Sequence, residues 1–372
     1  MPLNSRLAAL QMIRSFVNVR RSLQSDVLKI FVYVAAALVL GAILAPWVYQ
    51  LGKGLAEVTE GKQTNGLIAY VAKSAAKADF ATFFNRALML SAFVLLFPLL
   101  SWLQIGRAPG SYRDTPWSLR LPDSVVILNA GQPLQRNPRG WWQSSTGFIL
   151  AAGLLLLSGW VMLQAGCFMW KDAAESTKGA INRYQMDIEW AKAFRKVIPR
   201  ALAVSLIEEL LFRGVLLGIF LRAMKPAPAI ATLSFLFAFV HFLSPPPHAL
   251  IEDPEASNAG FILLGQIFHR FADPISMASG FLMLSVVGVV LGYARYRTAS
   301  LWLPVGLHAG WVFGMGIFKA ATWPVGNLPE TIRLFVGLNL LEGLLPLSVV
   351  LVTGILVHLM TRVDPLDEGD RV

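Results

Sequence analysis

The sequence predicts an all-α membrane protein, a polytopic bundle of about eight transmembrane helices. Hydrophobic residues make up 55% of the 372 residues, and charged residues only 15%. A soluble domain typically carries about 25% charged residues. Several apolar runs also reach the roughly 18–20 residues that a helix needs to cross a bilayer. We therefore expect a multi-pass integral membrane protein.

The N-terminal part of the chain is predicted to hold a surface helix and two spans. Residues 1–29 are basic and mildly amphipathic, and they lack the apolar stretch and small-residue cleavage site of a signal peptide. We expect them to form a helix that lies on the membrane surface. The first two spans are predicted at residues 30–49 and 87–103, with an amphipathic segment between them outside or at the edge of the bilayer.

A long polar loop separates the second span from the third. Residues 104–146 are rich in turn-forming proline and glycine. A short apolar run at residues 125–128 could form a strand, and the tryptophan pair at 141–142 is expected to anchor the next helix at the membrane interface. The third span is predicted at residues 147–169.

The rest of the chain is predicted to add one charged helix and five spans. Apolar residues recur every three or four positions within residues 170–200, which is typical of an amphipathic helix. The apolar segment 259–273 is too short to cross the bilayer, so we expect it to be re-entrant or interfacial. The five spans are predicted at residues 201–221, 229–243, 274–294, 299–318 and 334–360.

Charge and cysteine content exclude several classes of function. The net charge is +10, but the basic residues are dispersed and no nucleic-acid motif accompanies them. We therefore predict the lipid bilayer, and no nucleic acid, as a partner; the positive charge fits contact with anionic lipid. The single cysteine, Cys167, excludes an intrachain disulfide and a cysteine metal cluster, and we expect it to be buried and inert.

Three ionisable residues lie inside the apolar run 201–221: Glu208, Glu209 and Arg213. Each charge at membrane depth costs about 2.5–3.5 kcal/mol on insertion scales, so such residues are functional by default. On a helix, Glu209 and Arg213 are four residues apart and can pair, whereas Glu208 lies about 100° further round. A buried carboxylate without a full counter-charge is suited to act as a general base or acid. The alternative is a cluster that only fixes packing between helices.

Two histidines could join these carboxylates. His241 lies near the end of the predicted fifth span and His308 within the seventh. A lone histidine in a span is usually a hydrogen-bonding partner between helices. Two histidines and a glutamate from three different spans could instead hold one water and polarise a carbonyl group.

The order of these residues resembles that of a known family. The motifs are a glutamate pair with a following arginine, and two histidines in particular contexts: Glu208-Glu209-x-x-x-Arg213, Phe237-x-x-x-His241 and Pro304-x-Gly306-x-His308. In this order and on three separate spans, they resemble the CPBP family. That family comprises intramembrane proteases related to type II CAAX prenyl endopeptidases and to bacterial bacteriocin-processing or immunity (Abi) proteins. The resemblance covers about residues 197–318.

The resemblance implies a helical bundle with an active site in a cavity open to one side. It implies that Glu208 is the base that activates water. By the same resemblance, His241 and His308 orient the water or stabilise the oxyanion, and Glu209 with Arg213 supports the site. The implied substrate is a membrane-associated peptide or protein.

One position departs from the family pattern. Family members commonly carry asparagine four residues after the last histidine, where this chain has Val312. Valine cannot donate a hydrogen bond, and loss of one oxyanion donor typically lowers the rate about 10²–10³-fold. Either another donor replaces it, such as the indole of Trp311, or the activity is reduced.

A glutamate with two histidines is also a zinc-ligand set. The chain has no His-Glu-x-x-His element, and a zinc-bound glutamate would leave the role of base to another group. We therefore favour hydrolysis without a metal or other cofactor, with zinc as the alternative.

The sequence leaves three hypotheses on function. The first is an intramembrane endopeptidase; the second is a non-proteolytic membrane scaffold or immunity protein, which Val312 favours. The third is a proton-coupled transporter, against which the lack of an internal repeat counts. The predicted divisions are a basic segment, N-terminal helices with polar loops, a protease-like core, and a last helix with an acidic tail: residues 1–29, 30–196, 197–318 and 319–372.

Overall fold

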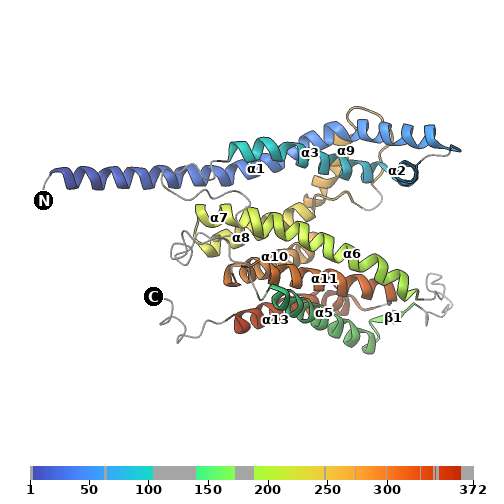
Figure 1. Cartoon of the computed structure of the whole chain (residues 1–372). Coiled ribbons are helices and arrows are strands. Elements are labelled where there is room, and N and C mark those ends of the chain that lie inside the picture. The colour runs from blue at the N-terminus through green and yellow to red at the C-terminus, as the bar shows by residue number, and fades with distance from the viewer. Residues whose placement is uncertain are drawn as a thin grey trace. The chain divides into compact units, whose positions relative to one another are not determined.

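The computed structural model is helical and is shown in Figure 1. It describes residues 3–62, 65–103, 140–171, 188–246, 249–272, 274–298, 300–326, 328–337, 340 and 343–361. The strand predicted at 125–128, most of the polar loop and the acidic tail lie outside these residues. The same holds for residues 172–187 of the predicted charged helix.

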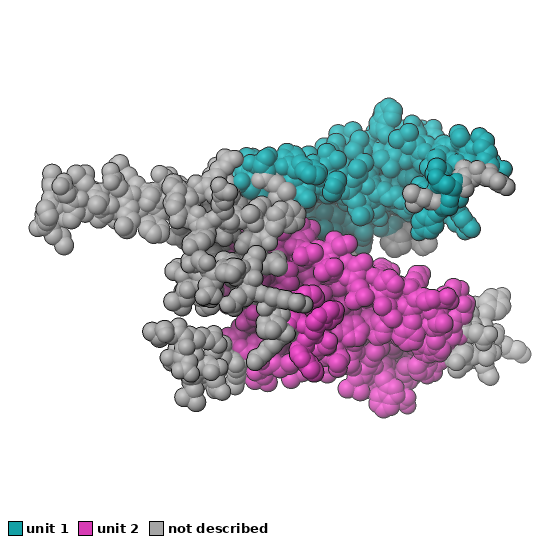
Figure 2. Space-filling view, in the orientation of Figure 1, with its two compact units in different colours: residues 1–114, 239–277 teal, residues 115–238, 278–372 magenta. Residues whose placement is uncertain are grey.

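The chain divides into two compact units, which Figure 2 distinguishes by colour. Unit 1 comprises residues 1–114 and 239–277, and unit 2 comprises residues 115–238 and 278–372. Each unit is therefore built from two separate stretches of the sequence.

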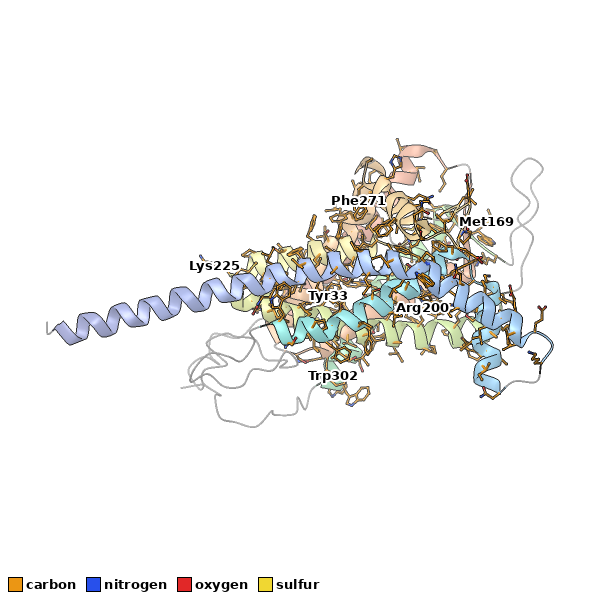
Figure 3. All side chains as sticks on the ribbon, turned by 90° about the horizontal axis from the view of Figure 1, so that it is seen from above. Tyr33, Met169, Arg200, Lys225, Phe271 and Trp302 are labelled. Carbon is orange, nitrogen blue, oxygen red and sulfur yellow. The ribbon has the colours of Figure 1, made fainter. Side chains whose placement is uncertain are left out.

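Unit 1 is organised around one long helix. Its elements are α1 (Leu3–Thr59), α2 (Gly66–Lys77), α3 (Phe80–Trp102), α9 (Ala259–His269) and the 3₁₀ turn η2 (Arg270–Ala272). Helix α1 packs along α3, and the Tyr33 hydroxyl donates a hydrogen bond to Ala92 O on α3 at 2.7 Å (Figure 3). Helix α9 also approaches α1 closely, because a Cβ atom at Gly260 would lie only 2.0 Å from Ala42 O. Glycine therefore permits this packing.

Helix α1 is continuous from the basic N-terminal segment through the predicted first span. The junction carries a buried ion pair, in which Lys29 Nζ lies 2.8 Å from Asp26 Oδ1. Lys29 also donates to Trp102 O at the end of α3, at 2.9 Å. The charges at the start of the span are thus matched within unit 1.

Unit 2 contains the remaining helices and a small sheet. Its elements, in chain order, are α5 (Gly140–Gln164), β1 (Phe168–Trp170), α6 (Trp190–Glu209), the π-helix η1 (Leu210–Leu216), α7 (Leu217–Ala223), most of α8 (Pro226–His241) and of α10 (Pro274–Thr298), α11 (Trp302–Ala321), β2 (Thr322–Pro324), α12 (Glu330–Val336) and α13 (Leu344–Met360). Strands β1 and β2 pair antiparallel, with Met169 opposite Trp323. This two-stranded sheet is the departure from the all-α prediction. Cys167, just before β1, is buried as expected.

Helix α11 is the central element of unit 2, packed against both α5 and α6 (Figure 1). Its contact with α5 depends on glycine: a Cβ atom at Gly306 would lie 2.1 Å from Ser144 O, and one at Gly310 would lie 2.6 Å from Phe148 O. Small residues at such four-residue spacing allow membrane helices to approach closely. Trp302, labelled in Figure 3, lies at the start of α11. Its ring stacks on that of Trp141 near the start of α5, with ring centroids 5.8 Å apart. These contacts fix the helix that carries His308.

The predicted helical architecture is confirmed, but the number of about eight spans is not. Within the described residues, four helices are long and apolar enough to cross a membrane: Asp26–Thr59, Phe80–Leu99, Gly140–Gln164 and Met277–Thr298. The apolar helices α8 and α13 are shorter. The span predicted at 334–360 is interrupted, since α12 ends at Val336 and α13 begins at Leu344. The predicted fourth span contains the π-helix η1, and α11 is largely buried inside unit 2.

Candidate active site

The glutamate pair lies where an α-helix changes into a π-helix. Helix α6 ends at Glu209, η1 follows, and α7 continues in the same direction (Figure 1). In a π-helix each N–H donates to the carbonyl five residues earlier. At the end of η1, Leu217 N–H donates in this way to Phe212 O. Short π-helices occur frequently at functional sites. The apolar pattern of the sequence predicted a regular helix and missed this change.

Glu209 is the central acceptor of the site. Its side chain is fully buried, and its Oε1 accepts a hydrogen bond from Arg213 Nη1 at 2.8 Å. The same oxygen lies 2.8 Å from His308 Nδ1 on α11. The pairing of Glu209 with Arg213 predicted from their spacing is therefore confirmed, and the structure adds His308 to it.

His308 is oriented by this contact. A carboxylate oxygen can only accept hydrogen bonds, so the proton of a neutral His308 ring lies on Nδ1. The other nitrogen, Nε2, lies 4.0 Å from Glu208 Oε2. That separation is too long for a direct hydrogen bond. His308 thus links a buried glutamate on one side with a second glutamate on the other.

Glu208 and Glu209 differ in their access to the surroundings. The side chain of Glu208 is 26% exposed, whereas that of Glu209 is 0% exposed. Adjacent positions on a helix point about 100° apart, which explains why one carboxylate is enclosed and the other is not. Glu208 is thus the more exposed carboxylate of the pair.

Arg213 is held by aromatic and backbone groups as well as by Glu209. Its Cζ lies 4.5 Å from the centroid of the Phe237 ring, within cation–π range. Its Nη2 donates to Gly288 O on α10 at 3.4 Å. Phe237 also packs edge-on against His308, with ring centroids 6.3 Å apart. One aromatic side chain therefore touches both partners of Glu209.

Comparison with known families agrees with this site. Residues 190–314 match a family model described as type II CAAX prenyl endopeptidase, Rce1-like. This part of the chain is similar to an Rce1-like domain. The match contains both glutamates, Arg213 and both histidines, and it confirms the resemblance identified from the motifs. No curated protein and no solved structure matches the chain.

The Rce1-like domain contains a buried donor next to Val312. Trp311 is 7% exposed, and its Nε1 has no hydrogen-bond partner among the described residues. Trp311 follows His308 by three positions on α11, so the two residues share a face of the helix. A buried donor without a protein partner is available to an acceptor on a ligand.

His241 is the last residue of α8 and is half-buried. It belongs to unit 1, whereas the glutamates, Arg213 and His308 belong to unit 2. Within unit 2 the structure brings together Glu208, Glu209, Arg213 and His308. The role of His241 stays a prediction. Within the described part of the chain, no three His, Cys, Asp or Glu residues are grouped in a way that would hold a metal ion.

Sequence reasoning missed two contributions from α10. Gly288 accepts a hydrogen bond from Arg213, and Arg295 donates to the backbone of the same residue. Gly288 acts through its backbone carbonyl, which every residue has, so its residue type does not predict this role. Arg295 was visible only as a positive charge near a helix end.

Proposed function

We propose that this protein is an intramembrane endopeptidase that hydrolyses peptide bonds in membrane-associated peptides or proteins. The observation that supports this best is the 4.0 Å separation between Glu208 Oε2 and His308 Nε2, with Glu209 bound to the opposite nitrogen of the same ring. Two polar atoms at this separation can be bridged by one water molecule. The family match supports the same class of reaction, because the Rce1-like model describes endopeptidases.

In the proposed reaction, Glu208 removes a proton from the bridging water as its oxygen attacks the carbonyl carbon of the peptide bond. His308 Nε2 accepts a hydrogen bond from the water and positions it for attack, and a donor such as His241 stabilises the resulting tetrahedral oxyanion. The proton held by Glu208 then moves to the amide nitrogen as the carbon–nitrogen bond breaks. The products are a carboxylic acid and an amine, and Glu208 returns to its carboxylate form, so atoms and charges balance.

The roles of the two glutamates follow from their surroundings. Glu209 is enclosed and already bound to Arg213 and His308, which suits it to orient the histidine ring. Glu208 is partly exposed, and its Oε2 lies 4.0 Å from the nitrogen of His308 that carries no proton in the proposed tautomer. Glu208 is therefore assigned as the general base.

The test is cleavage of a peptide library by purified full-length protein in detergent. Wild type is compared with Glu208→Gln, each with and without a chelator, and with both prenylated and unmodified peptides. Cleavage by wild type that is lost in the variant and insensitive to the chelator supports the proposal. Full activity in the variant contradicts the assignment of Glu208, and loss on chelation would favour the zinc alternative.

A second candidate function is a non-proteolytic membrane scaffold or immunity protein with the same fold. Val312, in the position of the family asparagine, is the feature that favours it. This candidate predicts that Glu208→Gln binds the same partner peptide as wild type and retains biological function. The endopeptidase proposal predicts binding of the peptide by the variant but no product.

A further inference from the structure

A second arginine is buried in unit 2, near the end of α10. Arg295 is only 1% exposed, and its Nη1 has no hydrogen-bond partner among the described residues. Among the described residues, no carboxylate lies within ion-pair distance of Arg295. A buried guanidinium without a carboxylate is unfavourable for stability, so its presence calls for a compensating role.

The contact that Arg295 makes is with the main chain of the candidate active site. Its Nε donates to Arg213 O on η1 at 3.4 Å. Both residues belong to unit 2. Arg295 is therefore bound to the backbone of the residue that holds Glu209.

A π-helix that returns to α-helical spacing leaves one carbonyl at its end without an intrahelical partner, and Arg213 O lies at this position. Leu217 N–H donates across five residues to Phe212 O, and from Leu217 onward the chain returns to the four-residue spacing of an α-helix. The step from five-residue to four-residue spacing skips the next carbonyl, which is that of Arg213. A buried carbonyl needs a donor, and Arg295 supplies it.

The same face of α10 holds Arg213 at a second point. Gly288 O accepts from Arg213 Nη2, and Gly288 lies seven residues, or about two turns, before Arg295. Glycine is required at this position, because a Cβ atom at Gly288 would lie 2.9 Å from Ser234 Cα on α8. Helix α10 thus contacts Arg213 twice. Gly288 O binds the side chain of Arg213, and the side chain of Arg295 binds the backbone carbonyl of Arg213.

We propose that Arg295 is a positioning residue for the reaction proposed above. By binding the carbonyl that η1 leaves open, it keeps the π-helical turn in place, and this turn directs Arg213 onto Glu209. Glu209 in turn fixes the ring of His308. Arg295 does not touch the reacting atoms in this proposal; it acts through Arg213.

The test compares Arg295→Gln and Arg295→Lys with a matched control, Arg297→Gln. Arg297 lies in the same last turn of α10 but donates to Thr361 at the end of α13 instead of to η1. In full-length protein, hydrogen exchange over residues 205–220 is measured by mass spectrometry, alongside the thermal unfolding midpoint. We expect Arg295→Gln to exchange faster than wild type in this segment. Arg295→Lys should exchange at a rate near that of wild type, and Arg297→Gln should show no change there.

The kinetic part of the test uses a cleaved peptide. We expect kcat to fall about ten- to a hundred-fold in Arg295→Gln with little change in KM, because misplacement of catalytic groups affects the chemical step. Arg295→Lys should recover most of kcat, since an ammonium group can still donate to the carbonyl.

The proposal is overturned if Arg295→Gln exchanges like Arg297→Gln in this segment. It is also overturned if wild type cleaves peptides and Arg295→Gln has the same kcat. If wild type cleaves no peptide, the proposed function is in question, and the exchange measurement alone then decides the role of Arg295.

Discussion

His308 Nδ1 lies 2.8 Å from Glu209 Oε1, the same oxygen that accepts a hydrogen bond from Arg213. This contact joins α11 to the junction of α6 and η1 at a fully buried carboxylate. In the proposed reaction, Glu209 therefore orients the ring, and the more exposed Glu208 acts as the general base.

We expect Glu208→Gln and Glu209→Gln to fail in different ways. Glu208→Gln should lose cleavage while its thermal unfolding midpoint stays near that of wild type, because Glu208 is 26% exposed. Glu209→Gln should be destabilised by about 3–5 kcal/mol, because it leaves the buried Arg213 without its counter-charge. Thermal unfolding in detergent, run beside the peptide assay, separates the two. Equal stability of both variants would contradict the distinct roles.

The glycines of α11 should be required for its contact with α5. A Cβ atom in Gly306→Ala would lie 2.1 Å from Ser144 O, so the two helices would have to separate. We expect a loss of about 1–3 kcal/mol and a lower thermal unfolding midpoint. Gly153→Ala on α5 is the matched control, since its Cβ would meet nothing within 4 Å. The control should be neutral or stabilising by up to about 1 kcal/mol; an equal loss in both variants would contradict close packing at Gly306.

Trp311 is expected to act as the donor that replaces the family asparagine. Its Nε1 is buried with no hydrogen-bond partner among the described residues. Trp311→Phe keeps most of the apolar bulk but removes the donor, and we expect kcat to fall by about 10²-fold. Adding Val312→Asn to that variant should restore part of the loss. Unchanged kcat in Trp311→Phe would exclude the indole as an oxyanion donor.

Asp79 should make the start of α3 sensitive to acid. The hydrogen bond from the Thr82 hydroxyl, followed by that from the Thr82 backbone, lowers the pKa of Asp79 below its ordinary value of 3.8. Because the folded pKa is the lower one, this stabilisation is complete above pH 3.8 and is lost as the pH falls through the folded pKa. Asp79→Asn retains an N-cap but should lose this acid dependence, and Asp79→Ala should cost about 1 kcal/mol. Unfolding midpoints measured between neutral and acidic pH provide the check.

Features set by one segment of the chain were predicted from the sequence. Low charge and long apolar runs identified a helical membrane protein, and four-residue spacing identified the pairing of Glu209 with Arg213. The motifs also identified the family that the Rce1-like match confirmed. Helical periodicity was less informative about which helices cross the membrane. An apolar helix buried inside a protein, such as α11, has a pattern close to that of a span exposed to lipid.

Contacts between segments were decided only by the tertiary structure. The attachment of His308 to Glu209 depends on the approach of α11 to α6, and the binding of Arg295 to Arg213 O depends on the approach of α10 to η1. The π-helix itself is a shift of one residue in backbone spacing, which the apolar pattern does not record. The sequence by itself therefore determined the membrane class, the family and the residues available for chemistry. The packing of helices, which depends on glycine contacts such as those at Gly288 and Gly306, decided which of those residues meet.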